Sequence, residues 1–270
     1  MKKAKSLRLI LCLILVAVEL VPIGVVITNS FKRDIDIWAR GPLYLKPTLK
    51  SYRAVFENSD FRLALKNSLI VATSSMVVSV FFGSMASFGL VRFNFRLNAF
   101  LIFLILMLRM VPQITLALPF YILFRNLGLK DTVMGLTVAH TSFNLPYVIA
   151  LLLPFFASIP KEYEEAARVD GCRPFSIYWR IFFPLAAPGV VVAAVFAFLM
   201  SWNEFLYALV LSGPRSKTAP IVVNAFLGQY APLWGQLSAG ATIMLIPVFA
   251  ITLGFQKYIV KGLSSGGLKG

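Results

Sequence analysis

The sequence predicts an all-α polytopic membrane protein with six transmembrane helices. Hydrophobic residues make up 59% of the 270 residues and charged residues 14%, and the mean hydropathy is +0.80. A soluble domain with so few polar residues could not cover its surface, so a membrane is the expected solvent. Six apolar runs are each long enough to cross a hydrocarbon core, which needs about 20 residues. Disordered, collagen-like, disulfide-rich secreted and ordinary cytosolic proteins are excluded by the same composition.

The apolar runs follow one another along the chain, with polar breaks between them. The first run is preceded by Lys2, Lys3, Lys5 and Arg8, as a signal peptide would be. It is too long for one, and no small-residue cleavage site follows it, so we interpret it as a retained helix. The six predicted spans are 9–28, 68–91, 99–124, 132–156, 188–211 and 237–255.

Prolines lie within or at the ends of these runs. A proline frees backbone groups inside a membrane helix, which is tolerated where neighbouring helices or a cavity satisfy them. A bundle with several kinked helices is therefore expected, although kinks suit a rigid membrane enzyme as well as a transporter. The prolines concerned are Pro22, Pro112, Pro119, Pro146, Pro154, Pro188 and Pro247.

Six spans place both termini on the same side of the membrane. The N-terminal flank carries basic residues and no acidic one, and the first helix usually dominates orientation, which favours cytoplasmic termini. Counted over the whole chain, the lysines and arginines are nearly balanced between the two sides, because the long first loop holds many of them. No soluble domain of useful size remains, so residues 1–270 are expected to form a single permease domain.

The net charge of +15 is spread over the breaks between the apolar runs. No nucleic-acid-binding motif accompanies it, and we interpret these charges as loops near an anionic lipid surface. Cys12 lies in the first run and Cys172 in a distant polar loop, so no disulfide is expected. The sequence offers no metal-ligand cluster, and neither a metal site nor a catalytic residue is predicted.

The loop at 158–187 carries the most information. Pro160 suits the first turn of a helix, and Glu162, Glu164 and Glu165 follow where carboxylates oppose the positive helix end. Gly171 is placed for a left-handed cap, and Pro174 for the start of a second helix. The spacing of Phe175, Tyr178 and Phe182 predicts one apolar face on that second helix. A helix–turn–helix outside the membrane is expected.

This loop resembles the membrane subunits of ATP-binding-cassette importers. Their pattern is E-A-A, three residues, G, nine residues, I-x-L-P; here Phe183 stands where the pattern has leucine. The stretches 29–32, 66–68, 202–205 and 260–270 are similar to maltose/trehalose-type carbohydrate permeases, specifically the shorter six-helix partner. The matching loop residues are Glu165, Ala166, Ala167, Asp170, Gly171, Ile181 and Pro184.

The resemblance implies the type I importer fold and a role in binding-protein-dependent sugar import. The loop would couple the permease to a separate ATPase. The resemblance also implies a heterodimer with a second permease, two ATP-binding subunits and an extracytoplasmic sugar-binding protein in a prokaryotic inner membrane. ATP and magnesium would be bound by those ATPase subunits, because this chain has no phosphate-binding loop of its own. Glycerol-phosphate-type substrates remain open.

The glycine-rich C-terminal tail, 257–270, is a second candidate contact with the ATPase. In this family the tail reaches the ATPase interface, and glycines let a backbone pass closely. A flexible end is the equal alternative. The tail residues concerned are Ser264, Ser265, Gly266 and Gly267.

Polar residues inside the apolar runs are candidates for the substrate path. An ionised side chain at mid-bilayer costs roughly 2.5–3.5 kcal/mol, so such residues usually face a cavity or a partner. Amides, carboxylates and aromatic faces bind sugars, but the same amides also hold helices together. Lone His140 is expected to be packed, and Arg109 is the one basic residue inside an apolar run. The candidates are Gln113, Asn144, Tyr147, Trp202, Asn203 and Glu204.

Two other classes of function were weighed. An ion-driven secondary transporter would need paired intramembrane acids or a proton relay, and often repeat symmetry. Glu19 and Glu204 lie on distant runs, and no internal repeat is visible. A membrane-embedded enzyme would need convergent acids, a Ser/His pairing or metal ligands, and one histidine offers little.

Overall fold

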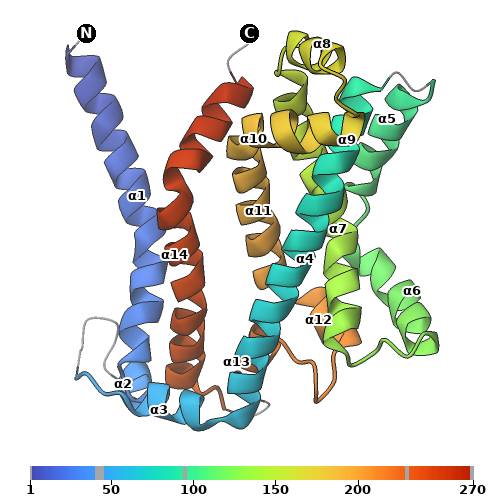
Figure 1. Cartoon of the computed structure of the whole chain (residues 1–270). Helices are drawn as coiled ribbons and strands as arrows, with labels where there is room; N and C mark the ends of the chain where they lie inside the picture. Colours follow the sequence, from blue (N-terminus) through green and yellow to red (C-terminus); the bar gives the residue numbers. More distant parts are fainter. Residues whose placement is uncertain (1, 40–45, 94–95, 229–230, 268–270) are drawn as a thin grey trace. The chain divides into compact units, whose positions relative to one another are not determined.

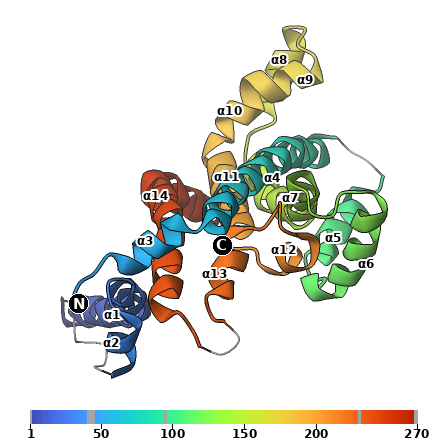
Figure 2. The same cartoon turned by 90° about the horizontal axis from the view of Figure 1, so that it is seen from below.

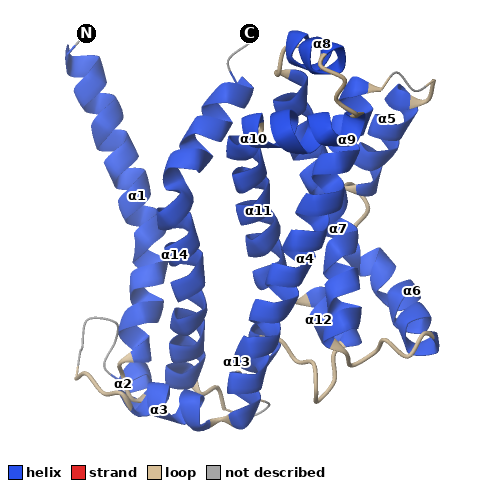
Figure 3. Cartoon of the chain, viewed as in Figure 1, coloured by secondary structure: helices blue, strands red, loops and turns tan. Residues whose placement is uncertain are grey.

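The computed structural model describes residues 2–39, 46–93, 96–228 and 231–267, and every regular element in these ranges is helical (Figure 3). The helical fold class is confirmed. The elements are α1 Lys2–Ser30, α2 Asp34–Ala39, α3 Lys50–Glu57, α4 Ser59–Arg92, α5 Asn98–Leu108, α6 Gln113–Asn126, α7 Val133–Ala157, α8 Glu162–Val169, α9 Pro174–Ile177, the π-helical turn η1 Tyr178–Phe182, α10 Phe183–Leu185, α11 Ala187–Trp202, α12 Leu206–Leu211, α13 Ala219–Ala225 and α14 Trp234–Gly267.

Four of the predicted spans coincide with long apolar helices. These lie in α1, α4, α7 and α14, and each is long and apolar enough to cross a membrane. Two further pairs of helices pass the same criterion but are bent, α5 with α6 by 92° and α9–α10 with α11 by 80°. The structure therefore supports four to six membrane spans in the described residues.

The two remaining predicted spans differ from simple helices. The run 99–124 is broken at residues 109–112, where Pro112 adopts an extended conformation and has no amide proton to continue the helix. The run 188–211 is also divided, because α11 ends at Trp202 and α12 begins only at Leu206. The kink expected at Pro112 is a complete break, whereas the continuous apolar composition of 188–211 gave no signal of the second break.

The chain divides into two compact units, and each is described by itself. The first comprises residues 1–63 and 221–247. In it, the amide of Gly235 at the start of α14 donates to the Asp34 carboxylate of α2 at 2.8 Å. Trp38 packs edge-on against Trp234, with ring centroids 6.0 Å apart. These contacts fix the start of α14 against α2.

The second unit, residues 64–220 and 248–270, holds the larger buried core. Its helices α4, α7 and α11 run side by side (Figures 1 and 2). Gly189 on α11 lies so close to Phe155 on α7 that an added Cβ would come within 2.4 Å of that ring. Small residues of this kind let membrane helices approach closely. The core extends from these helices into α8 and the arm that follows it.

Asp131 joins two loops of the second unit. Its carboxylate accepts the amide of Ser216 at 3.0 Å, the hydroxyl of Ser216 at 2.8 Å and the amide of Arg215 at 3.1 Å. Burial alone would raise the pKa of this carboxyl, but these hydrogen bonds and one from the Gly213 backbone lower it below its usual value. Asp131 thereby holds the α6–α7 loop against the segment after α12.

Replacing Asp131 with asparagine is expected to destabilise the protein by about 1–2 kcal/mol near neutral pH, because charge-assisted hydrogen bonds are lost. The pKa of Asp131 is lower in the folded protein than in the unfolded chain, where it is about 3.9, so the ionised carboxylate stabilises the folded state above that pH. This stabilisation is lost as the pH falls through the pKa of Asp131 in the folded protein. Thermal unfolding in detergent at pH 7 and at pH 3 measures this. A gap in melting temperature between wild type and variant that does not shrink at pH 3 would contradict the assignment.

Candidate functional site

The segment between α7 and α11 forms two short helical arms joined at a glycine. The first arm, α8, begins with three carboxylates at its positive end. It ends at Gly171, whose φ of +77° is a left-handed conformation that favours glycine. The amide of Cys172 donates to Ala167 at 2.9 Å and that of Gly171 to Arg168 at 3.0 Å, which closes the cap. The predicted helix–turn–helix is confirmed.

The second arm differs from the prediction in one respect. Pro174 starts α9 as expected, and Tyr178 and Phe182 are buried in the core. Phe175, however, is 62% exposed and packs edge-on against Trp179. Phe175 and Tyr178 nevertheless line one hollow against α4, so Phe175 is the exposed end of the predicted apolar face. A π-helical turn at 178–182 winds more widely than an α-helix and changes which side chains align.

A hollow of about 450 Å³ lies along α8 and the start of the second arm. In Figure 2 the segment α8–α10 extends away from α4 and α7. Of the residues identified by the family pattern, four line the hollow, namely Ala166, Ala167, Asp170 and Ile181. The other three, Glu165, Gly171 and Pro184, are exposed. Most of the pattern residues are therefore accessible or line the hollow, whereas Ala167 belongs to the buried core.

Arg92, the last residue of α4, connects this loop to the membrane helices. Its guanidinium donates to the carbonyls of Phe156 at 3.0 Å and Ile159 at 2.5 Å, which end α7. The same group lies 3.9 Å from the Glu164 carboxylate of α8 and 4.4 Å above the Phe182 ring. Only 3% of its side chain is exposed. Sequence analysis missed this residue because its partners lie 64 or more positions away.

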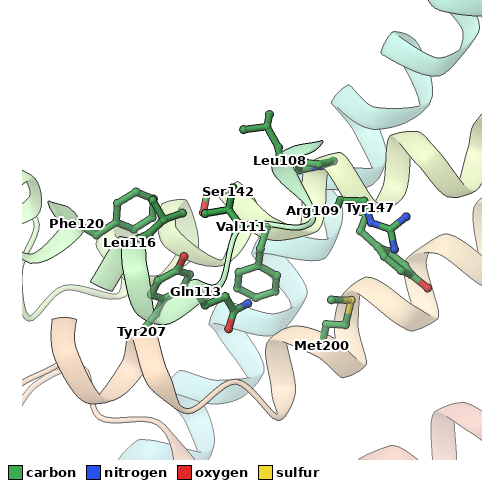
Figure 4. A pocket seen from close by; sticks show the side chains of 12 residues that line it. Leu108, Arg109, Val111, Gln113, Leu116, Phe120, Ser142, Tyr147, Met200 and Tyr207 are labelled. Carbon is green, nitrogen blue, oxygen red and sulfur yellow. The ribbon is translucent and has the colours of Figure 1, made fainter. Parts of the chain in front are cut away.

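A separate cavity of about 460 Å³ lies at the break between α5 and α6 (Figure 4). This volume falls in the range of small-molecule sites, about 300–1,000 Å³. Its wall is mostly aromatic and aliphatic, with a few polar groups from α5–α7 and α12. The lining residues are Leu108, Arg109, Val111, Gln113, Leu116, Phe120, Ser142, Phe143, Pro146, Tyr147, Met200 and Tyr207.

Two of the residues predicted for the substrate path lie in this cavity, Gln113 and Tyr147. Asn144 does not line it. That side chain is fully buried and donates to the Ala197 carbonyl at 3.1 Å, which links α7 to α11. Arg109 is in the wall although it was not among the predicted candidates. The sequence did hold a signal for Arg109, because it is the one basic residue within an apolar run.

The remaining three candidates cluster around the break between α11 and α12. Trp202 is 1% exposed and stacks on Phe198 with ring centroids 5.8 Å apart. The amide of Asn203 donates to the Leu199 carbonyl at 2.9 Å and caps the end of α11. Neither side chain lines the cavity. Asn203 is exposed and its side-chain amide bonds within its own helix, so a role of these two residues in the substrate path stays a prediction.

Glu204 lies at the centre of a buried polar network. Its carboxylate accepts the amides of Tyr207 at 2.8 Å and Ala208 at 3.1 Å and so caps α12. The same carboxylate lies 3.3 Å from His140 Nε2 on α7. His140 Nδ1 shares a hydrogen bond of 2.6 Å with Ser201 on α11. The expectation of a packed His140 is confirmed, because its side chain is fully buried.

Replacing Glu204 with alanine is expected to lower stability by about 2–4 kcal/mol, because two amides and a buried histidine lose their partner. Glu204→Gln keeps one acceptor and should lose less. The melting temperatures of the purified variants measure this. An unchanged melting temperature for Glu204→Ala would contradict a capping role.

The predicted tail contact falls at the end of α14. The backbone of 264–267 continues that helix, while the side chains of Ser264 and Ser265, the surroundings of Gly266 and Gly267 and all of 268–270 lie outside what the structure describes. The tail contact stays a prediction.

Comparison with known proteins places this geometry in a family. A family model described as "Binding-protein-dependent transport system inner membrane component" matches residues 76–265. The sulfoquinovosyl glycerol transport system permease protein of Agrobacterium fabrum is 33% identical over 98% of this chain and 94% of its own length. The trehalose transport system permease protein of Mycobacterium tuberculosis is 38% identical over 83% of this chain and 82% of its own.

The fold is shared with a solved structure of a bacterial ABC transporter involved in the import of the acidic polysaccharide alginate. The TM-score is 0.77 at 23% sequence identity, with 94% of this chain and 95% of that chain covered. The likeness confirms the expected importer transmembrane fold.

Proposed function

Because this chain belongs to the family of binding-protein-dependent transport system inner membrane components, we propose that it forms half of the membrane pathway of an ATP-driven sugar importer. The observation that carries the proposal is the two-armed loop, whose cap, exposed carboxylates and hollow present a surface for a second protein. Sugar as the substrate is supported by the relatives, whose names specify transport of trehalose and of sulfoquinovosyl glycerol.

The loop would transmit motion from the ATPase to the membrane helices. Closure of an ATPase dimer on ATP would move the loop, and helices carry such displacement as rigid elements. Glu165 and Asp170 are exposed charges that would form the polar rim of the contact with the ATPase. The small side chain of Ala166 would let the ATPase approach the backbone of α8. Arg92 then passes the displacement on to α4 and α7, because it contacts both helices and α8.

The remaining subunits follow from the same proposal. This chain would pair with a second, different permease and would contact two ATP-binding subunits and an extracytoplasmic sugar-binding protein. ATP and magnesium would be held by the ATP-binding subunits, and this chain would contribute neither a catalytic residue nor a bound cofactor. Both termini would lie in the cytoplasm, where Ser264–Gly267 could reach the ATPase.

The cavity at the α5–α6 break is the proposed sugar path within this chain. Aromatic faces such as Tyr147 and Phe120 suit the apolar faces of a pyranose ring, and Gln113 supplies both a donor and an acceptor for hydroxyl groups. A mostly preformed cavity of this size admits a mono- or disaccharide. The named substrates of the relatives include neutral and acidic carbohydrates, so family membership does not fix the charge of the sugar.

Purification in mild detergent from the native host, with a tag on this chain, tests the proposal. We expect a second permease and an ATP-binding subunit to co-elute, with ATP turnover stimulated by the binding protein. A chain that elutes alone and still moves solute under an ion gradient would support a secondary transporter instead.

A further inference from the structure

Arg109 gives the cavity its only formal charge among the lining residues. The residue caps the C-terminal end of α5, directly before the 92° bend into α6. Its guanidinium lies 4.9 Å from the centre of the Tyr147 ring, and the two side chains lie against each other in Figure 4. Within 2–39, 46–93, 96–228 and 231–267, no carboxylate forms an ion pair with it.

A guanidinium held over an aromatic ring by a cation–π contact does not use up its N–H donors. The five N–H donors point outward in the plane of the group. These donors match the two oxygens of a carboxylate, sulfonate or phosphate in a bidentate pair. Hydroxyl groups of a neutral sugar need no full positive charge, and the polar groups of Gln113 and Ser142 would suffice for them.

The start of α6 adds to the positive character of the same break. Pro112 is its N-cap, and its side chain cannot accept a hydrogen bond from the first amides of the helix. Uncapped amides and the positive end of a 14-residue helix favour a negative group. Gln113, the first residue of α6, lines the cavity, so this helix end and Arg109 adjoin the same space.

We propose that the cavity accepts a carbohydrate bearing an acidic group, with Arg109 as the residue that selects for the negative charge. This inference rests on the proposed function, because it assumes that the cavity is part of the sugar path. Two other occupants could supply a negative group, namely a carboxylate of the second permease or the phosphate of a membrane lipid. Each of them predicts a different result when the charge is removed.

The experiment measures ATP-driven uptake by the complete complex in proteoliposomes, with its partner permease, ATPase subunits and binding protein. The probes are mono- and disaccharides in matched pairs, one neutral and one with a uronic acid in place of a hexose. The variants are Arg109→Gln and Arg109→Lys. Arg125→Gln is the matched control, because it removes an exposed charge from the same bent pair of helices, α5 and α6, outside the cavity.

We expect wild type to import the acidic member of a pair, Arg109→Gln to reduce that uptake at least about tenfold, and Arg109→Lys to retain a substantial part of it. The control should stay within about twofold of wild type. Import of only the neutral member, unaffected by Arg109→Gln, would overturn the inference while the proposed function stands.

Two further results would count against the inference for different reasons. Loss of the partner permease from purified Arg109→Gln would assign Arg109 to subunit assembly. Equal loss of acidic and neutral uptake in an intact complex would assign it to lipid binding or to the fold. Absence of uptake of every probe, with ATP hydrolysis that no binding protein stimulates, would contradict the proposed function itself.

Discussion

Replacing Arg92 with leucine is expected to reduce sugar uptake per ATP hydrolysed about tenfold while the complex still assembles. Leucine preserves much of the buried apolar contact but removes the donors to Phe156 and Ile159 and the charge beside Glu164. The polar link between α4, α7 and α8 is then lost while their apolar packing remains, and coupling between distant sites is typically about 1–3 kcal/mol. Hydrolysis would continue, but the loop would move without carrying the membrane helices with it.

The measurement is paired uptake and ATPase activity in proteoliposomes at equal complex content. Arg92→Lys tests the role of the fork-shaped group, because an ammonium cannot hold two carbonyls and a carboxylate in the same planar arrangement. It should recover only part of the coupling. Arg96→Leu, at an exposed position four residues further along, controls for loss of a basic residue at this end of the protein. Unchanged uptake per ATP in Arg92→Leu would contradict the assignment.

The second large effect is expected at the glycine between the two arms. Proline fixes φ near −65° and has no amide proton, whereas Gly171 has a φ of +77° and donates to Arg168. Gly171→Pro should therefore reorient the second arm and abolish uptake, with the chain still inserted in the membrane. Glu165→Lys, which reverses an exposed charge on α8, should also uncouple transport without disturbing the cap.

Gly128 provides a matched control for backbone strain. Its φ is +68°, its amide donates to Arg125 and the next amide donates to Phe124, so it ends α6 as Gly171 ends α8. Gly128→Pro imposes the same conflict between the φ of proline and a left-handed backbone, but at a position outside the loop at 158–187. Uptake should fall further in Gly171→Pro than in Gly128→Pro at equal amounts of membrane-inserted protein. Equal losses, or normal uptake by both Gly171→Pro and Glu165→Lys, would contradict the coupling role.

The parts of the fold that local chemistry determines could be predicted from the sequence. Apolar length is sufficient to locate α1, α4, α7 and α14, because a membrane helix needs only a long apolar stretch. The helix–turn–helix of the loop at 158–187 could also be predicted from the sequence. Pro174 and Gly171 have few conformations available, so their positions specify where a helix starts and ends.

The parts that depend on distant contacts could not be predicted. Arg92 is an ordinary basic residue at a helix end until folding brings the carbonyls of Phe156 and Ile159 to it. A kink at Pro112 was expected, but a complete break with a 92° bend was not, since prolines such as Pro119 and Pro146 lie inside helices that continue through them. Only the packing around each proline distinguishes a tolerated kink from a break.

The sequence also did not show which polar side chains of the candidate substrate path face the cavity. Gln113 and Tyr147 face the cavity, whereas Asn144 and Glu204 satisfy backbone groups of neighbouring helices. Both kinds of residue are polar positions in apolar runs, and composition cannot separate them. The direction of each side chain depends on the angle between its helix and the next one.

The most direct test of the account is uptake into proteoliposomes that contain this chain with its partner permease, ATPase subunits and binding protein. The driving force is either ATP or an imposed ion gradient. We expect accumulation of sugar with ATP and the binding protein, and none with the gradient alone. Solute accumulation driven by the ion gradient, by this chain without ATP or any partner, would contradict it.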